Sequence, residues 1–545
     1  MKLNRYISVI AAALTLVACT DMNEIVPEGG TMLASQLQET NAAVPTRAAA
    51  SFAGLFNPIG NPDYFGYDTP DDWGILMMLF CNDVEGADAT LPDSGYNWFS
   101  VCGEYSSRNA SYRNPVIRYR TPYMIIANVN DFLAGFGEDV TDPSSLAMMG
   151  QAKALRAYAY MQLAANFQFT YTVAKDQPCV PICSPEIEDP ANNPRATVET
   201  IYGLIMDDLN SALELVEGYE RPSKMYIDSH VVYGLRARAN LTMGEWAAAA
   251  ADAEKAAEGF TPATIEEVSH PSFMDINEHN WIWGFDMTAD VAKTFKYATT
   301  SSWLRSFSAW AYAAGAGCYT QINKILYDKI SSTDVRKGWW VDENLYSPLL
   351  DGIVWDGGDA GKAVGQDVAT FEYDDKLCFV PYTNVKFGCD PIGTTDNAED
   401  SPLMRVEEMI LIQAEAYAKG GNEAKGRQIL QDFVKTYRDP EYNTQAGGRN
   451  LADEIWFQRR VELWGEGFGI HDTKRLNKPL VRWLGDPDGT NVAPAFRFNI
   501  AADDGWLNMR FTNGELNTNF GIVDNTGGEL PKMDQNPSLR DGVTN

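Results

Sequence analysis

Apolar residues recur at helical spacing through much of this chain, and the helical segments come in pairs. In residues 198–216, Ile201, Ile205 and Leu209 return every four positions, which predicts a helix with one buried face. The alanine-rich residues 146–169 come before it and predict a second long helix. The stretch between them is rich in proline and cannot continue either helix. We therefore expect these two helices to pack as a pair.

Two later pairs resemble each other when they are aligned, which indicates a repeat architecture. The pairs are residues 229–243 with 245–258, joined by Gly244, and residues 403–419 with 422–437, joined by Gly420 and Gly421. Alanine lets antiparallel helices approach closely, and glycine can adopt the left-handed turn between them. This pattern is typical of tetratricopeptide repeats, with two unrelated helical hairpins as the alternative.

The chain changes character between the repeats, over residues 261–400. Gly, Asp and aromatic residues dominate there, and residues 281–285 predict a short strand. No linker-like break divides the chain, so we expect one domain over residues 51–545, with repeats near residues 146–260 and 401–468. The predicted fold class is mostly α, with tetratricopeptide-like helical repeats and a loop-rich ligand-binding region.

The N-terminus has the three parts of a secretory leader. A short positive segment is followed by the apolar residues 7–16 and then by Ala18 and Cys19. The apolar run is too short to span a bilayer. A leader cut before cysteine is typical of lipoproteins, whose thiol is acylated before cleavage. The sequence therefore predicts a signal peptide over residues 1–18, a lipid on Cys19 and a flexible tether over residues 19–50.

The composition excludes two classes of partner. With 43 Lys and Arg against 74 Asp and Glu, the formal net charge is -31, which argues against binding to nucleic acid or to an anionic lipid surface by charge. The cysteines form no regular framework, so disulfides are not expected to hold the fold together. Cys179 and Cys183 are the nearest pair, and a bond between them is one interpretation.

The sequence contains no motif that anchors a known catalytic chemistry. The four histidines lack the spacing of a zinc site, and neither a G-x-S-x-G elbow nor a phosphate-binding loop of the Walker type is present. We predict that the protein is not an enzyme and has no cofactor. A surface glycoside hydrolase stays an alternative, because two facing carboxylates cannot be recognised among so many acids. Structural calcium in the Asp- and Gly-rich turns near residues 356–359 and 486–489 is the other open possibility.

Aromatic residues beside polar ones are the more informative signal. A sugar ring offers an apolar face and a rim of hydroxyls, so its binder needs flat aromatics for stacking and polar neighbours for hydrogen bonds. The candidate ligand-binding residues are Asp72, Trp73, Tyr96, Asn97, Trp98, Trp303, Arg305, Trp310 and Trp339. The competing interpretation of each is a place in the core, which is the usual position of Trp and Tyr in a large domain.

Several segments, taken in order behind the lipoprotein leader, resemble the SusD/RagB family of surface lipoproteins. They are Gly150 to Tyr158, Ile201-Tyr202 with Asp207 to Leu209, Glu278 to Trp283, Leu326 to Asp328 with Asp334 to Arg336, Arg405 to Met409, Ala414 to Ala416, and Arg459 to Leu463 with Gly465 to Gly467 and Asp472 to Arg475. We interpret the pairs Arg405 with Glu408 and Arg459 with Glu462 as packing contacts of the repeat helices.

The resemblance implies a function. It implies a protein anchored in the outer membrane by its lipid, which captures oligosaccharides outside the cell and delivers them to a SusC-like TonB-dependent transporter. Some members of the family take peptides, so a receptor for peptides or other non-glycan nutrients is the alternative on the same fold.

Overall fold

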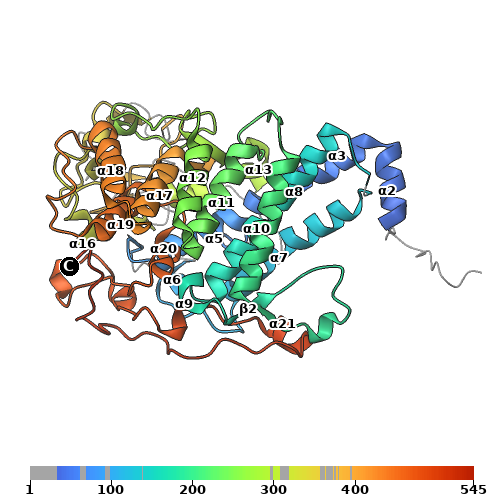
Figure 1. Ribbon diagram of the computed structural model, residues 1–545. Helices are drawn as coiled ribbons and strands as arrows, with labels where there is room; N and C mark the ends of the chain where they lie inside the picture. Colours follow the sequence, from blue (N-terminus) through green and yellow to red (C-terminus); the bar gives the residue numbers. More distant parts are fainter. Residues whose placement is uncertain are drawn as a thin grey trace, which may run out of the picture.

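Seven helices pack side by side in the order of the sequence and form the scaffold of the protein (Figure 1). They are α7 (Arg113–Ala134), α8 (Pro143–Phe167), α10 (Val198–Leu215), α11 (Ser229–Met243), α12 (Trp246–Ala257), α17 (Val406–Lys419) and α18 (Glu423–Tyr437). The structure is a computed structural model that describes residues 34–61, 69–92, 99–137, 139–294, 299–306, 318–355, 362–363, 372–373, 376–377, 380–392, 394 and 396–545. The mostly α fold class and its helical repeats are confirmed.

The repeat pairs form for the reasons that the sequence suggests. Asp228 caps α11 by accepting a hydrogen bond from the amide of Val231, and Gly244 ends the helix in the left-handed region, at φ 82°. The alanines between α11 and α12 are fully buried, Ala237 and Ala253 among them. One boundary differs: residues 401–405 form a strand, and the first helix of the later pair begins only at Val406.

The N-terminal helices differ from the predicted tether. Helices α2 (Ala34–Ala43) and α3 (Pro45–Gly54) occupy a segment expected to be flexible up to residue 50. Gln38 donates from Nε2 to the carbonyl of Ala134 at 3.0 Å, and Asn41 donates from Nδ2 to that of Gly135 at 3.1 Å. These contacts fix α2 at the C-terminal end of α7, at one end of the molecule in Figure 1. The segment expected to be a flexible tether therefore contains helices from Ala34 onward, and two amide side chains hold the first of them in place.

Shorter helices surround the scaffold. The closing helices α19 (Leu451–Glu462) and α20 (Gly469–Arg475) follow the last repeat pair. The others are α4 (Asn57–Gly60), α5 (Gly74–Glu85), α6 (Ser100–Gly103), α9 (Tyr171–Ala174), α13 (Ala289–Thr294), α14 (Thr300–Leu304), α16 (Lys324–Tyr327) and α21 (Asn513–Thr518). Beyond α20 the chain runs mostly without regular structure along one edge of the molecule (Figure 1).

The strands form only two-stranded antiparallel sheets among the described residues. The pairs are β1 (Ala89–Thr90) with β5 (Gln321–Ile322), β2 (Pro178–Pro181) with β3 (Arg195–Thr197), β4 (Trp281–Phe285) with β10 (Ser401–Arg405), β6 (Val354–Trp355) with β7 (Lys362–Ala363), and β8 (Glu372–Tyr373) with β9 (Lys376–Leu377). The predicted strand at residues 281–285 is confirmed as β4. Its register places Trp281 opposite Arg405, so β4 positions that arginine at the start of α17.

The large aromatic residues lie in the core between the repeats and the loop-rich region. Trp73, Trp281, Trp283, Trp303 and Trp339 are among the largest fully buried side chains. Cys179 and Cys183 are free thiols, so the suggested bond between them is absent. Across the described residues, no helix has the length and apolar character needed to cross a membrane.

Candidate functional site

Five of the nine predicted ligand-binding residues are buried. Trp303 and Trp339 are 0% exposed, and Asp72, Trp73 and Arg305 are 1% exposed. The indole N–H of Trp339 also donates a hydrogen bond to the carbonyl of Val268, at 3.0 Å. A ring without exposed surface cannot stack on a sugar, so the structure disagrees with the stacking role predicted for Trp73, Trp303 and Trp339, whose rings lie in the core. Asp72 and Arg305 are buried as well.

The remaining predicted residues lie outside the described part of the chain. Tyr96, Asn97, Trp98 and Trp310 belong to this group, as does Cys19 with its predicted lipid. Their roles stay predictions.

An open hollow of about 120 Å³ lies at the start of α7, close to the predicted Asp72. At its edge, Tyr112 is 46% exposed and lies next to Arg113 in the chain. Arg113 donates from Nε to Oδ2 of Asp71 at 2.9 Å, and this ion pair also lines the hollow. An exposed aromatic ring beside a charged pair is the combination that sugar binding needs.

The floor of this hollow is buried and combines apolar side chains with polar ones, Asn114 and Arg118 among them. It is formed by α5, α6 and α7, with Met78 and Ile117 buried against the core. The thiols of Cys81 and Cys102 lie 3.9 Å apart there. The hollow therefore presents a polar and aromatic mouth over a buried base, and we call it the Tyr112 hollow.

The sequence-based prediction missed Tyr112 because each polar and aromatic cluster that it selected contains a tryptophan, and the segment around Tyr112 has none. The available signal was the polar stretch from Ser106 to Asn114, in which Tyr112 is the lone aromatic residue. A tyrosine in such a stretch has few apolar neighbours to bury it.

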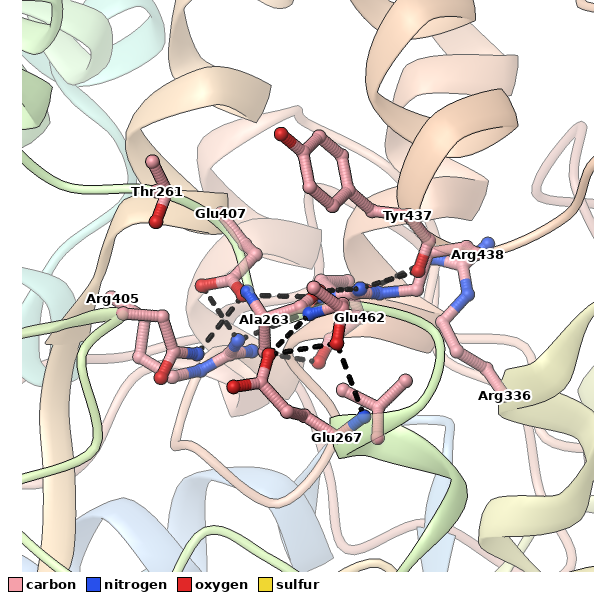
Figure 2. Close-up of polar contacts among 12 residues, drawn as sticks. Thr261, Ala263, Glu267, Arg336, Arg405, Glu407, Tyr437, Arg438 and Glu462 are labelled. Atoms are coloured by element: carbon pink, nitrogen blue, oxygen red, sulfur yellow. Dashed lines mark hydrogen bonds and ion pairs between the residues drawn. The ribbon is translucent and has the colours of Figure 1, made fainter.

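A buried charge network joins the loop-rich region to the last repeat pair. Figure 2 shows Glu407 and Glu462 among three arginines, Arg336, Arg405 and Arg438. Arg438 donates from Nε and Nη2 to the two oxygens of Glu462, both at 2.8 Å. Arg405 lies 2.9 Å from Glu407 and 3.2 Å from Glu462, and Arg336 lies 3.3 Å from Glu462.

The network is balanced in charge. Its members are the cations Arg336, Lys386, Arg405 and Arg438 and the carboxylates Asp334, Glu407, Glu462 and Glu466, and we call this set the central charge network. Burial alone would raise the pKa of Glu462, but Arg438, Arg405 and Arg336 hold it well below its usual range. Burial lowers the pKa of Lys386 to about 8. Each charge of the network is therefore compensated inside the protein, and none needs a ligand as its partner.

Two predicted pairings differ from those in the structure. Glu408 pairs with Arg238, at 2.6 Å, and Arg459 pairs with Asp472, at 2.8 Å. Arg405 and Glu462 instead pair with each other. The prediction of packing contacts is right in kind, but the partners come from distant segments that helical spacing cannot reveal.

A metal site is not apparent in the described residues, where no group of three or more His, Cys, Asp or Glu side chains is placed to hold an ion. In the turn at residues 486–489, a carboxylate oxygen of Asp486 accepts a hydrogen bond from the amide of Asp488 at 3.0 Å. The other turn considered for calcium, at residues 356–359, lies outside the described residues.

The row of antiparallel helix pairs defines a helical-repeat protein. Two family models match the chain: one described as starch-binding and associating with the outer membrane over residues 76–241, and that of the SusD family over residues 382–538. The chain belongs to the SusD/RagB family, whose members are carbohydrate- or nutrient-binding proteins associated with the outer membrane.

Solved structures share the fold. A SusD-like carbohydrate binding protein from Bacteroides vulgatus ATCC 8482 is 24% identical, with a TM-score of 0.70 over 88% of this chain and 97% of that chain. A SusD superfamily protein from Bacteroides thetaiotaomicron VPI-5482 is 18% identical, with a TM-score of 0.66 over 88% and 99% of the two chains. A SusD superfamily protein from Bacteroides fragilis is 19% identical, with a TM-score of 0.64 over 88% of this chain and 98% of that chain. A comparison with curated protein sequences finds no match.

Proposed function

We propose that the protein captures an oligosaccharide at the outer cell surface and delivers it to a TonB-dependent transporter, held to the membrane by a lipid on Cys19. The observation that carries the binding step is the Tyr112 hollow, where an exposed ring lies beside the Asp71–Arg113 ion pair. Family membership supports the delivery step. Binding needs a preformed shelf but no catalytic group, so the proposed protein is a receptor and not a hydrolase.

The binding step is tested with the purified mature protein on a glycan array, followed by titration of the glycans that bind. Changing Tyr112 to Ala should weaken glycan binding about tenfold or more, because it removes a stacking face and its buried area. Tyr346 is the matched control, since it is also 46% exposed and its hydroxyl hydrogen-bonds to a carboxylate, that of Asp351. Equal affinity of the Tyr112→Ala and Tyr346→Ala proteins would remove the hollow from the proposal.

The same assay distinguishes the alternatives. Binding to a peptide panel and to no glycan would favour a peptide receptor on this fold. Release of shortened products from a bound oligosaccharide would show a hydrolase. A Trp98→Ala protein tests the remaining aromatic prediction, and unchanged affinity would exclude that residue.

The delivery step requires a partner and an anchor. Purification from the native membrane should recover a transporter with the protein. A Cys19→Ala protein should fold and bind ligand but no longer support uptake. Recovery without a transporter, or normal uptake by the Cys19→Ala protein, would contradict this part of the proposal.

A further inference from the structure

Two cysteines lie against each other in the floor of the Tyr112 hollow. Cys81 belongs to α5 and Cys102 to α6, and the thiol of Cys102 donates to the sulfur of Cys81, with 3.9 Å between the two sulfur atoms. At that distance no other side chain fits between them. Both residues line the hollow, with 5% and 4% of their surface exposed. The protein therefore holds two thiols in contact at the base of an open hollow.

A bond between these thiols requires only a small movement. The sulfur atoms of a disulfide lie about 2 Å apart, so the two thiols would have to approach each other by about 2 Å. Rotation of the two side chains supplies part of this approach, and a shift of a helix supplies the rest. Helix α6 has four residues, whereas α5 has 12 and is buried along nearly its whole length. We therefore expect α6 to move and α5 to stay in place.

The charges beside the thiols affect how fast they react. A thiolate, and not a thiol, attacks a disulfide, and a nearby cation stabilises the thiolate. The contact with Cys81, burial and the charge of Glu85 raise the pKa of Cys102, and the buried guanidinium of Arg118 opposes them. Arg118 interacts with both thiols and lies 3.1 Å from Glu85. The raised pKa makes exchange slow at neutral pH, so we expect the reaction to take hours even in mild alkali.

We propose that Cys81 and Cys102 form a reversible disulfide by exchange with a small disulfide that enters the Tyr112 hollow. One protein thiolate attacks a sulfur of the small disulfide, which gives a mixed disulfide and releases one small thiolate. The other cysteine loses its proton and attacks the protein sulfur of the mixed disulfide, which releases the second small thiolate. The protein thus loses two protons and two electrons, and the small disulfide is reduced to two thiols. This inference does not depend on the proposed glycan receptor.

The bond would change both the hollow and the stability of the protein. Drawing α6 towards α5 also moves Val101, which is 39% exposed and lines the hollow. The reduced and oxidised proteins would therefore present hollows of different shape. The bond also joins two positions 21 residues apart, which restricts the unfolded chain and should raise the melting temperature Tm.

The probe is bis(2-hydroxyethyl) disulfide, added in excess to the reduced full mature protein at pH 8. Remaining thiols are then blocked with N-ethylmaleimide in denaturant, and the protein is cut with trypsin. No Lys or Arg lies between Arg47 and Arg108, so residues 48–108 form one peptide, and Cys81 and Cys102 are its only cysteines. By mass spectrometry we expect this peptide to carry no blocking group and to be lighter than its dithiol form by two hydrogen atoms. Dithiothreitol should restore both thiols.

Single variants identify the bond and its effect. Cys81→Ser and Cys102→Ser should each lack the internal bond, and at least one of them should keep a mixed disulfide with the probe. Oxidation should raise the Tm of the wild type by about 2–5 °C and should not raise that of either variant. The control is Cys183→Ser, since Cys183 is partly exposed and its sulfur contacts Asn130. It should form the Cys81–Cys102 bond as the wild type does.

Three results would overturn the proposal. N-ethylmaleimide on both cysteines after treatment with the probe would mean that the thiols do not exchange. A mixed disulfide on each cysteine would mean that they react but cannot reach each other. A lower Tm of the oxidised wild type would mean that the fold does not accommodate the bond.

Discussion

The central charge network and the set of Arg108, Arg118 and Glu85 are both buried, but they differ in charge balance. In the network, Glu462 contacts three arginines, and carboxylates equal cations in number. In the other set, two arginines share the single carboxylate of Glu85, Arg108 at 2.8 Å and Arg118 at 3.1 Å. Neutral groups accept from the remaining donors there: Arg108 also donates to the carbonyl of Leu507, and Arg118 to the side-chain oxygen of Asn166. A buried cation therefore needs hydrogen-bond acceptors, but not always a carboxylate of its own.

The largest effect is expected from breaking the balanced set. Glu462→Gln keeps the shape of the side chain but removes the negative charge that three buried arginines share. We expect it to lower the free energy of unfolding by about 3–5 kcal/mol, measured by urea denaturation. The control is Glu423→Gln, which breaks a pair whose glutamate is 65% exposed and should cost less than about 0.5 kcal/mol. A loss below 1 kcal/mol for Glu462→Gln would contradict the role of the network.

Acid should remove the same stabilisation. The arginines hold the pKa of Glu462 below its usual 4.5, so its contribution is present above pH 4.5 and is lost as the pH falls below that value. The difference in stability between the wild type and the Glu462→Gln protein should therefore shrink as the pH falls from about 4.5 to 2, which denaturation at a series of pH values would show. A constant difference would argue against the assigned pKa direction.

Lys474, a buried cation near Arg108 and Glu85, should respond in the opposite way. We expect Lys474→Met to be as stable as the wild type or about 1–2 kcal/mol more stable at pH 6. Lys474 ionises near pH 7 in the folded protein, facing Arg108, Glu85, Cys179 and Arg118, but near 10.5 in the unfolded chain. The unfolded chain therefore binds more protons between these values, and stability of the wild type rises with pH.

The pH dependence of stability measures the pKa of Lys474 directly. Relative to Lys474→Met, the stability of the wild type should rise by up to about 1.4 kcal/mol per pH unit between pH 7 and 10.5. Other groups titrate equally in both proteins and cancel in the difference. A flat difference in thermal or urea stability over this range would mean that Lys474 keeps an ordinary pKa.

The smallest effect is expected at the Tyr112 hollow. Arg113 is 35% exposed and its pair with Asp71 faces solvent, so Arg113→Gln should change the free energy of unfolding by less than about 1 kcal/mol. If the hollow binds glycan, the same protein should still lose affinity in the titration described above. A large loss of stability would show that Arg113, like Glu462, is needed for the stability of the fold.

The helices were predictable because their signals are local. The repeat of Ile201, Ile205 and Leu209 and the turn at Gly244 depend only on neighbouring residues, and α10 and α11 lie where that pattern puts them. The aromatic prediction failed at Trp303 and Trp339 because burial is decided by segments far apart in the sequence. Trp339, for example, packs edge to face on Phe273, 66 positions away in the chain.

The predicted charge pairs were wrong for the same reason. Arg405 reaches Glu462 across 57 positions, and helical spacing only suggested Glu408, three residues away. Likewise, no sequence pattern pairs Arg238 with Glu408 or Arg475 with Glu415, because these side chains meet only once the closing helices and the repeats have packed.

If Cys19 carries a lipid, as we propose, the docking of α2 sets the length of the link between the folded body and the membrane. With α2 fixed to α7, at most about 50 Å of extended chain separates Cys19 from Ala34, against about 105 Å for a tether ending at residue 50. A folded body of this size has a radius of gyration of about 24 Å. Such a link is about as long as the body is wide, so it would leave the body free to turn while keeping the end that carries α2 within about 50 Å of the bilayer.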